Sequence, residues 1–280
     1  MINTVKTAFL LGALMGLCML LGHWFLGPHG VLIGLIFGGL GNVLAYFYSD
    51  KIALASMGGK EIQRSDLPWL FDIIERLATR AGLPMPRVYV CPQPAPNAFA
   101  TGRNPRHAAV AVTRGLLEHL SPAQIEGVIA HELGHVKHRD MLISTVAAVM
   151  AGLISYAGYM IMFFGGRDRD NPLGALGMLL MIILAPIAAA LIQAAISRQR
   201  EFAADAYAAE LTGDPEKLAS ALEQLGVANK RIATQTPPAF NNLYIVEPLA
   251  PGETMAAWFA THPPIKERIA ALRAMESRLG

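Results

Sequence analysis

Four uncharged apolar stretches constrain this chain more than any other feature of its sequence. Each is long enough to cross the hydrocarbon core of a bilayer, which takes roughly 20 apolar residues in a helix. Only 16% of the residues are charged, against about 25% in a typical soluble domain. The sequence therefore predicts four transmembrane helices in contact with a lipid bilayer, at Thr7–Leu26, Val31–Tyr48, Met141–Phe164 and Leu173–Ile196.

Two other interpretations of these stretches are weaker. The first stretch follows Lys6, as the apolar part of a signal peptide would. However, no small-residue cleavage site follows it, and a second apolar stretch begins within a few residues. The third and fourth stretches could be buried helices of a soluble protein, but each is longer than an ordinary core helix.

Lysine and arginine residues near the span ends predict the orientation in the membrane. Lys6 precedes the first stretch, Lys51 follows the second, and the turn between these two stretches has neither residue type. Lys137 precedes the third stretch and Arg198 follows the fourth. We therefore expect a multi-pass protein of the cell inner membrane, with both termini and both polar segments in the cytoplasm.

Charge and cysteine content exclude two broad classes of protein. The formal net charge is only +2 and no basic run occurs, so the sequence predicts no nucleic-acid partner. Cys18 and Cys91 are too few and too far apart for a disulfide framework and are expected to be free thiols.

The four stretches divide the chain into alternating membrane and polar parts. We expect a transmembrane hairpin at 1–48 and a second one at 141–196. The polar parts, 49–140 and 197–280, are together the size of one ordinary domain. The fold class expected for the chain is mainly α, with a small β-sheet in the polar domain.

The first polar part contains one predicted helix and two predicted strands before the main motif. The helix is expected to be capped near Ser65 and to end at Ala81, before Gly82. Strands are expected at Arg87–Cys91 and Ala108–Thr113. The loop between them, PQPAPNAFATGRNPRH, is either a surface turn or one wall of a peptide-binding cleft.

The segment VIAHELGHVKHRDM carries the strongest indication of chemistry. Ser121 and Gln124 form a capping-box pattern, so a helix should begin at about Pro122. On that helix His131 and His135 lie one turn apart and can bind one metal ion, while Glu132 can reach a water on that ion. Zinc lowers the pKa of such a water, and a glutamate can accept its proton during attack on a carbonyl. We therefore predict one catalytic Zn²⁺ per chain.

The third ligand should come from beyond the second hairpin. His138 is about 10 Å along the same helix from His131 and cannot easily converge with it on one ion. The second hairpin leaves the cytoplasmic surface soon after His135 and returns just before SRQREFAADAYAAEL. Glu201 is therefore expected to complete a two-histidine, one-glutamate zinc site. Asp205, one helical turn later, is expected to accept the other N–H of a ligating histidine, although both carboxylates could instead lie on a solvated face.

HELGHVKHRDM, the hydrophobic hairpin and SRQREFAADAYAAELTGDP resemble the HtpX membrane zinc metalloproteases, relatives of the eukaryotic CAAX prenyl endopeptidase. PNAFATG and THPPIKERIAAL extend the resemblance over nearly the whole chain. It implies a gluzincin-like protease domain that cleaves membrane-protein or peptide substrates, typically in membrane protein quality control. It also implies zinc ligands at His131, His135 and Glu201, with Glu132 as the base.

Three further residues are weaker candidates. His262 precedes a predicted helix and could hydrogen-bond a developing oxyanion, and Arg268 could pair with Asp205 or with the reaction intermediate. The family resemblance places similar positions at the active site, but a helix cap and a surface cation remain open alternatives. The same resemblance places Asn97 near the strand that would bind the substrate. The sequence is equally compatible with Asn97 simply forming part of a turn.

Three rival functions are less well supported by the sequence. A non-catalytic membrane scaffold or chaperone with a structural zinc would not need Glu132 as a base. An intramembrane protease would hold its metal inside a span, whereas His131 and His135 lie among charged residues such as Glu126 and Lys137. A transporter would need charged groups within its spans, and the four stretches contain none.

Overall fold

The computed structural model describes residues 2–147, 149, 198–228, 232, 243–245 and 263–279. Within this part of the chain the protein is mainly helical and contains a four-stranded sheet. Residues 141–147, at the start of the third predicted transmembrane stretch, are helical. Most of that stretch and all of the fourth lie outside the described residues.

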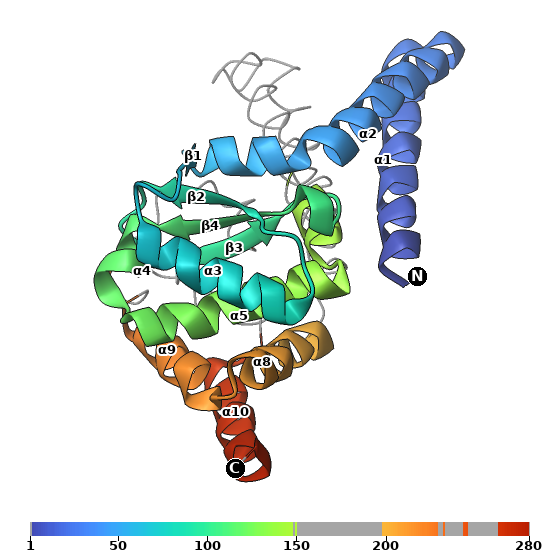
Figure 1. Ribbon diagram of the computed structural model, residues 1–280. Coiled ribbons are helices and arrows are strands. Elements are labelled where there is room, and N and C mark those ends of the chain that lie inside the picture. The colour runs from blue at the N-terminus through green and yellow to red at the C-terminus, as the bar shows by residue number, and fades with distance from the viewer. Residues whose placement is uncertain are drawn as a thin grey trace.

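The first two helices form a hairpin that projects from the rest of the molecule (Figure 1). They are α1 (Ile2–Leu26) and α2 (Pro28–Ser56). Glycines let them approach closely, because a β-carbon on Gly34 would lie 2.3 Å from the carbonyl oxygen of Cys18. Of the described helices, α2 is long and apolar enough to cross a membrane, whereas in α1 the apolar part found is Leu11–Leu20.

Helix α2 continues well beyond the predicted span, which ended at Tyr48. Its last turns carry Ala53 and Leu54, which pack on one face of the sheet together with Met57. This burial and the lack of a helix breaker before Gly58 explain the extension. The same helix thus joins the apolar hairpin to the polar domain.

The sheet has the strand order β1-β2-β4-β3 and confirms both predicted strands. Strands β2 (Arg87–Cys91) and β4 (Ala109–Thr113) are parallel, while β1 (Lys60–Glu61) and β3 (Ala98–Thr101) pair antiparallel at the two edges. Strand β3 lies within the predicted loop. Pro96 and Gly102 flank this four-residue strand, and two of its residues are alanines, so the local sequence resembled a turn.

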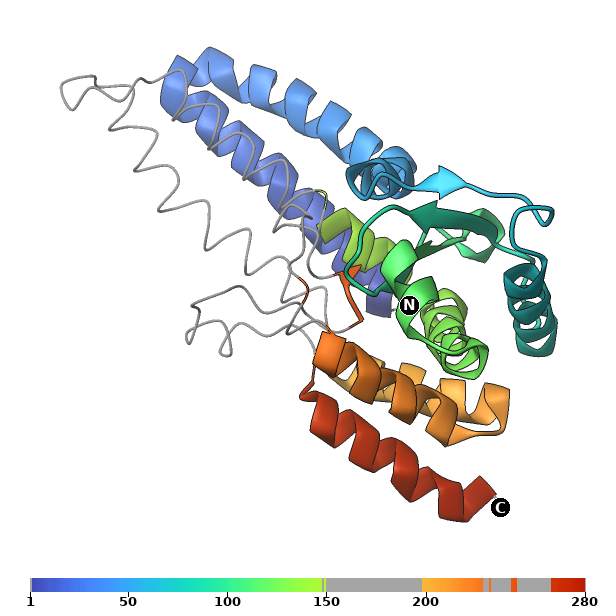
Figure 2. The ribbon, with the colours of Figure 1, turned by 90° about the vertical axis from the view of Figure 1, so that its left-hand side faces the viewer.

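Alternate strand residues face two different helical layers. Val88, Val110 and Val112 pack with α3 and α5, whereas Tyr89, Phe99 and Ala111 pack with the end of α2. This alternation is the two-residue period of strand side chains. The sheet is therefore covered on both faces, as Figure 2 shows.

Helix α3 (Pro68–Ala81) begins later than predicted. Ser65 does not cap it; residues 64–66 form a turn in which the Asp66 carboxylate accepts a hydrogen bond from the Gln63 N–H at 2.7 Å. Pro68 occupies the first helical turn, where its missing N–H costs nothing. The predicted end is confirmed, since Gly82 adopts the left-handed conformation with φ 66°.

The predicted metal-binding motif lies on α5 (Pro122–His138), which follows the short α4 (Arg114–His119). The predicted capping box is confirmed: Ser121 Oγ accepts from the Gln124 N–H at 3.4 Å, and Gln124 Oε1 accepts from the Ser121 N–H at 2.9 Å. Helices α8 (Arg198–Thr212), α9 (Pro215–Ala228) and α10 (Ile265–Leu279) stack beyond α5, on the side away from the sheet (Figure 2).

Close contact between α5 and α9 predicts a large effect for a small substitution. A β-carbon on Gly127 would lie 2.6 Å from the backbone nitrogen of Leu218. We expect Gly127→Ala to destabilise the fold by about 1–3 kcal/mol, because the backbones must move apart. Thermal unfolding of the full chain in detergent measures this effect. Gly12→Ala, at a helical position with no such neighbours within 4 Å, is the control; equal midpoints for the two variants would contradict the packing.

Candidate metal centre

Two helices bring three potential metal ligands together. His131 and His135 lie one turn apart on α5, and their Nε2 atoms are 3.2 Å apart. Glu201, in the first turn of α8, places its Oε2 atom 3.9 Å from Nε2 of His131 and its Oε1 atom 3.5 Å from Nε2 of His135. One ligand atom from each residue lies within 4.8 Å of the other two.

The donor set fits a zinc ion. Ligands at about 2.0–2.1 Å in a tetrahedron lie about 3.3 Å from one another, close to the distances seen here. Nδ1 of His131 lies 2.9 Å from Oδ1 of Asp205, and Nδ1 of His135 lies 3.5 Å from Oδ2 of Asp140. When the two rings bind a metal, each Nδ1 keeps its proton for these carboxylates and each Nε2 is the metal-binding atom.

A close helix contact allows Glu201 to reach the histidines. A β-carbon on Gly134 would lie 3.3 Å from the α-carbon of Ala204, so larger residues here would separate α5 from α8. Gly134, which lies between the two histidines in sequence, therefore allows α8 to pack close enough for Glu201 to reach them.

Asp205 links His131 to a buried arginine on α10. Arg268 donates to both Asp205 oxygens, from Nε at 2.8 Å and from Nη2 at 2.7 Å, and its side chain is inaccessible to solvent. Burial alone would raise the pKa of Asp205, but the charge and hydrogen bonds of Arg268 outweigh it and lower that pKa to about 2. Asp205 is thus held as an anion beside His131.

The structure pairs Arg268 with Asp205, one of the two partners expected from the sequence. Arg268 Nη1 also lies 3.6 Å from Oε2 of Glu201. Burial opposes the charged form of Arg268, but the charge and hydrogen bonds of Asp205, together with the charges of Glu201 and Glu132, outweigh burial and raise the pKa of its guanidinium. His262 lies outside the described residues.

Glu132 lies between the ligand cluster and the edge strand β3. Its Oε2 atom accepts a hydrogen bond from the Ala100 N–H at 2.7 Å. Burial raises the pKa of Glu132 despite the opposing effect of His131 and His135. A buried carboxylate with a raised pKa beside metal ligands is the environment of a general base.

His135 lies among several carboxylates that favour a positive charge. Burial would lower its pKa, but the hydrogen bond to Asp140 and the charges of Glu201 and Glu132 raise the pKa to about 9. This part of the molecule therefore favours a cation at the position that the three ligands surround.

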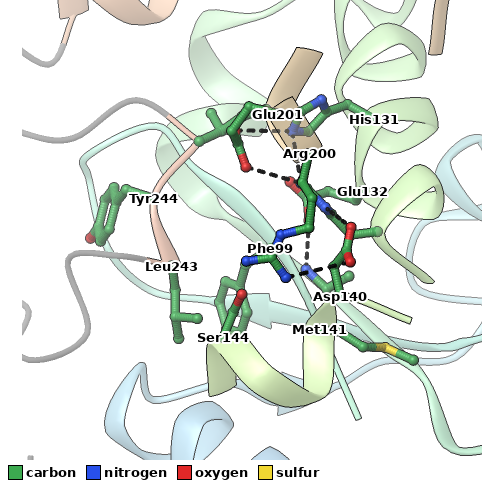
Figure 3. Close-up of a pocket in the computed structure, with 13 residues that line it drawn as sticks. Phe99, His131, Glu132, Asp140, Met141, Ser144, Arg200, Glu201, Leu243 and Tyr244 are labelled. Carbon is green, nitrogen blue, oxygen red and sulfur yellow. Dashed lines mark hydrogen bonds and ion pairs between the residues drawn. The ribbon is translucent and has the colours of Figure 1, made fainter. Parts of the chain in front are cut away.

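A cavity opens beside these residues, and its walls come from separate parts of the chain (Figure 3). Phe99 and Ala100 of β3 line it together with Met141 and Ser144, which follow α5. Residues 243–245 line it as well. Asn97 positions this segment, because its Nδ2 donates to the Leu243 carbonyl at 3.2 Å and its Oδ1 accepts from the Ile245 N–H at 3.0 Å. Asn97 is thus buried beneath the cavity wall rather than part of a surface turn.

Sequence reasoning missed two residues that support His135. Asp140 reaches back to His135, and Arg200 Nη1 lies 3.5 Å from Oδ1 of Asp140. Arg139 makes this possible by adopting φ 58°, which reverses the chain after α5. The only available sequence signal was an aspartate shortly after the second histidine, which resembles any charged helix end. His138 is exposed, and its ring centroid is 5.5 Å from that of Tyr207.

The Asp205 contact predicts the effect of a conservative substitution. We expect Asp205→Asn to weaken zinc binding about 10- to 100-fold, because the amide loses the charge that orients His131. Competition with a chelator of known affinity measures the change on protein that elutes as a folded species. Asp214→Asn, at an exposed position outside the site, is the matched control. Equal zinc affinities in the two variants would show that Asp205 does not support the ligand.

Comparison with known proteins identifies similar chains. Peptidase family M48 matches residues 64–276. A protease HtpX homolog from Desulfatibacillum aliphaticivorans is 47% identical over 284 residues, covering 99% of this chain and 91% of that protein. Another, from Persephonella marina, is 48% identical over 286 residues, covering 99% of each. The crystal structure of S. mikatae Ste24p has a similar fold, with a TM-score of 0.53 and 21% identity, covering 97% of this chain and 65% of that one.

Proposed function

Because this chain belongs to peptidase family M48 and is an HtpX homolog, we propose that it is a membrane-bound endopeptidase that cleaves membrane proteins in their quality control. As a member of that family it is a zinc metallopeptidase. The observation that carries the proposal is the position of Glu132, which lies beside the His131–His135–Glu201 cluster and contacts edge strand β3.

In this proposal each residue of the site has a defined role. His131, His135 and Glu201 would hold the zinc, which when bound would act as a Lewis acid and lower the pKa of the attacking water. Glu132 accepts the proton of the attacking water and passes it to the leaving amine. His262 stabilises the negative charge that develops on the carbonyl oxygen. Arg268 holds Asp205, and Asp205 holds His131 in place.

The edge strand suggests how a substrate is aligned. The Ala100 N–H points away from β4, toward Glu132, so backbone groups of Ala98 and Ala100 lie along the edge of the sheet that pairs with no other described strand. An extended peptide can add to such an edge through its main chain. This places its peptide bonds beside Glu132 without requiring a particular side chain. Asn97 contributes by holding residues 243–245 across the cavity from β3.

In this proposal the site lies at the cytoplasmic surface of the inner membrane. Met141 and Ser144, which line the cavity, lie in the first turns of the third apolar stretch. The cleft therefore lies next to the point where the chain is proposed to enter the bilayer. In this arrangement residues 1–48 and 141–196 are the membrane hairpins, and residues 49–140 and 197–280 form the protease domain.

Cleavage-site mapping tests this function. The full chain is reconstituted in liposomes with zinc and a membrane-protein substrate, and new amino termini are identified by mass spectrometry. We expect internal cleavages that stop on chelation and resume when zinc is restored. If the zinc-loaded protein cleaves no peptide bond in any membrane protein or unfolded polypeptide offered, the non-catalytic scaffold is the better account.

A further inference from the structure

A second cavity, of about 610 Å³, lies where the apolar part of α2 meets the polar domain. One wall is α2, with Val43 and Phe47 on its surface. The opposite wall includes Arg103 and Arg106, from the segment between β3 and β4 that contains the short helix η1 (Pro105–His107). The cavity is separate from the metal centre and shares no lining residue with it.

The charges around this second cavity are unbalanced. Its lining contains four cations, Lys51, Arg87, Arg103 and Arg106, but Asp50 is the only carboxylate among the residues that line it. Arg87 already pairs with Asp50, at 3.0 Å from Nη2 to Oδ2. Three cations therefore face the cavity without a carboxylate of the lining to balance them, which favours an anionic ligand.

The other wall of the cavity is apolar and continuous with the proposed membrane span. The side chains of Val43 and Phe47 are 51% and 49% exposed, although they lie on the apolar part of α2. The guanidinium of Arg103 lies over the Phe47 ring, 5.8 Å from its centroid. Cationic and apolar surfaces thus meet at one place, as an amphiphilic ligand requires.

The positive-inside pattern does not account for these cations. Lys51 directly follows the predicted span, so its charge fits the usual bias at a cytoplasmic helix end. Arg103 and Arg106 are far from every span in the sequence, and only the fold brings them beside α2. Their position therefore indicates a built site rather than a topology signal.

We infer that this cavity binds the phosphate of an anionic phospholipid headgroup from the cytoplasmic leaflet, with the acyl chains along Val43 and Phe47. Basic pockets beside transmembrane helices bind such headgroups through the same combination of charge and apolar contact. The inference rests on the proposed membrane placement of α2 but not on the chemistry of the metal centre. The bound lipid would hold the sheet at a fixed height above the bilayer.

A binding experiment with matched variants tests the inference. The full chain in a neutral detergent is titrated with phosphatidylglycerol, and the lipid-bound fraction is measured by native mass spectrometry. We expect Arg103→Gln/Arg106→Gln to bind phosphatidylglycerol about thirtyfold more weakly than the wild type. Arg80→Gln/Arg114→Gln removes the same charge at exposed positions outside the cavity and should bind like the wild type.

Two further titrations identify the source of the phosphate. Phosphatidylcholine should bind wild type and both double variants equally weakly, and inorganic phosphate should not displace phosphatidylglycerol at millimolar concentration. Equal phosphatidylglycerol binding by the two double variants would overturn the inference, as would displacement by inorganic phosphate. Circular dichroism and gel filtration establish that each variant is folded. The lipid-binding and displacement measurements do not depend on protease activity, so they can fail independently of the proposed function.

Discussion

Replacing Glu132 with glutamine is expected to reduce peptide hydrolysis by about 10²- to 10⁴-fold while leaving zinc in place. The amide has nearly the same shape as the carboxylate and can still contact the Ala100 N–H through its oxygen. It cannot accept the proton of the attacking water, so the loss should fall on kcat. Hydrolysis of a peptide substrate by purified, zinc-loaded wild type and Glu132→Gln measures the difference.

Glu210→Gln controls for the loss of one carboxylate. Glu210 is exposed on α8, outside the metal centre, and its substitution should leave hydrolysis unchanged. The wild type, Glu132→Gln and Glu210→Gln must contain equal amounts of zinc, so that a difference in hydrolysis reflects catalysis and not metal loss. Normal turnover by zinc-loaded Glu132→Gln would remove Glu132 from the mechanism and favour a different base.

Glu201→Ala is expected to release zinc and abolish activity, whereas His138→Ala should do neither. Removing an outer partner of a ligand costs about 10- to 100-fold in metal affinity, so removing a ligand should cost more. Glu201 lies 3.5 Å from Nε2 of His135, but His138 is exposed beside Tyr207. Zinc per chain after gel filtration, measured by elemental analysis, distinguishes the two residues.

The two alanine variants have opposite expected outcomes, so each serves as the other's control. Both remove one side chain of similar size within the same region of the fold. Full zinc occupancy in Glu201→Ala together with zinc loss in His138→Ala would reverse the assignment. Zinc loss in both would indicate that the region unfolds, which circular dichroism would detect.

The helix that carries the motif was predictable because its signals are local. Ser121, Pro122 and Gln124 specify the start of α5, and the one-turn spacing of His131 and His135 places both on one face. Glu201 is distant in sequence, and its position was predicted from the path of the chain through the membrane. The structure places its carboxylate beside both histidines.

Other parts of the site depend on tertiary contacts that no local pattern reveals. Strand β3 is short and rich in alanine, and its pairing with β4 defines it. Asp140 reaches His135 only because Arg139 takes a left-handed conformation, which is uncommon for a residue other than glycine. The start of α3 is different, because a local signal sets it: Pro68 at the first turn outweighed the capping pattern at Ser65.

X-ray absorption at the zinc edge of the metal-loaded wild type tests the central claim most directly, because it reports the ligand set itself. If His131, His135 and Glu201 bind the zinc, the spectrum should show two imidazole ligands, oxygen atoms as the remaining ligands, and no sulfur. In Glu201→Ala reloaded with excess zinc, the two-imidazole signature should remain while the ligand shell changes. A spectrum of the wild type with three imidazoles, or with sulfur in the first shell, would contradict this metal centre.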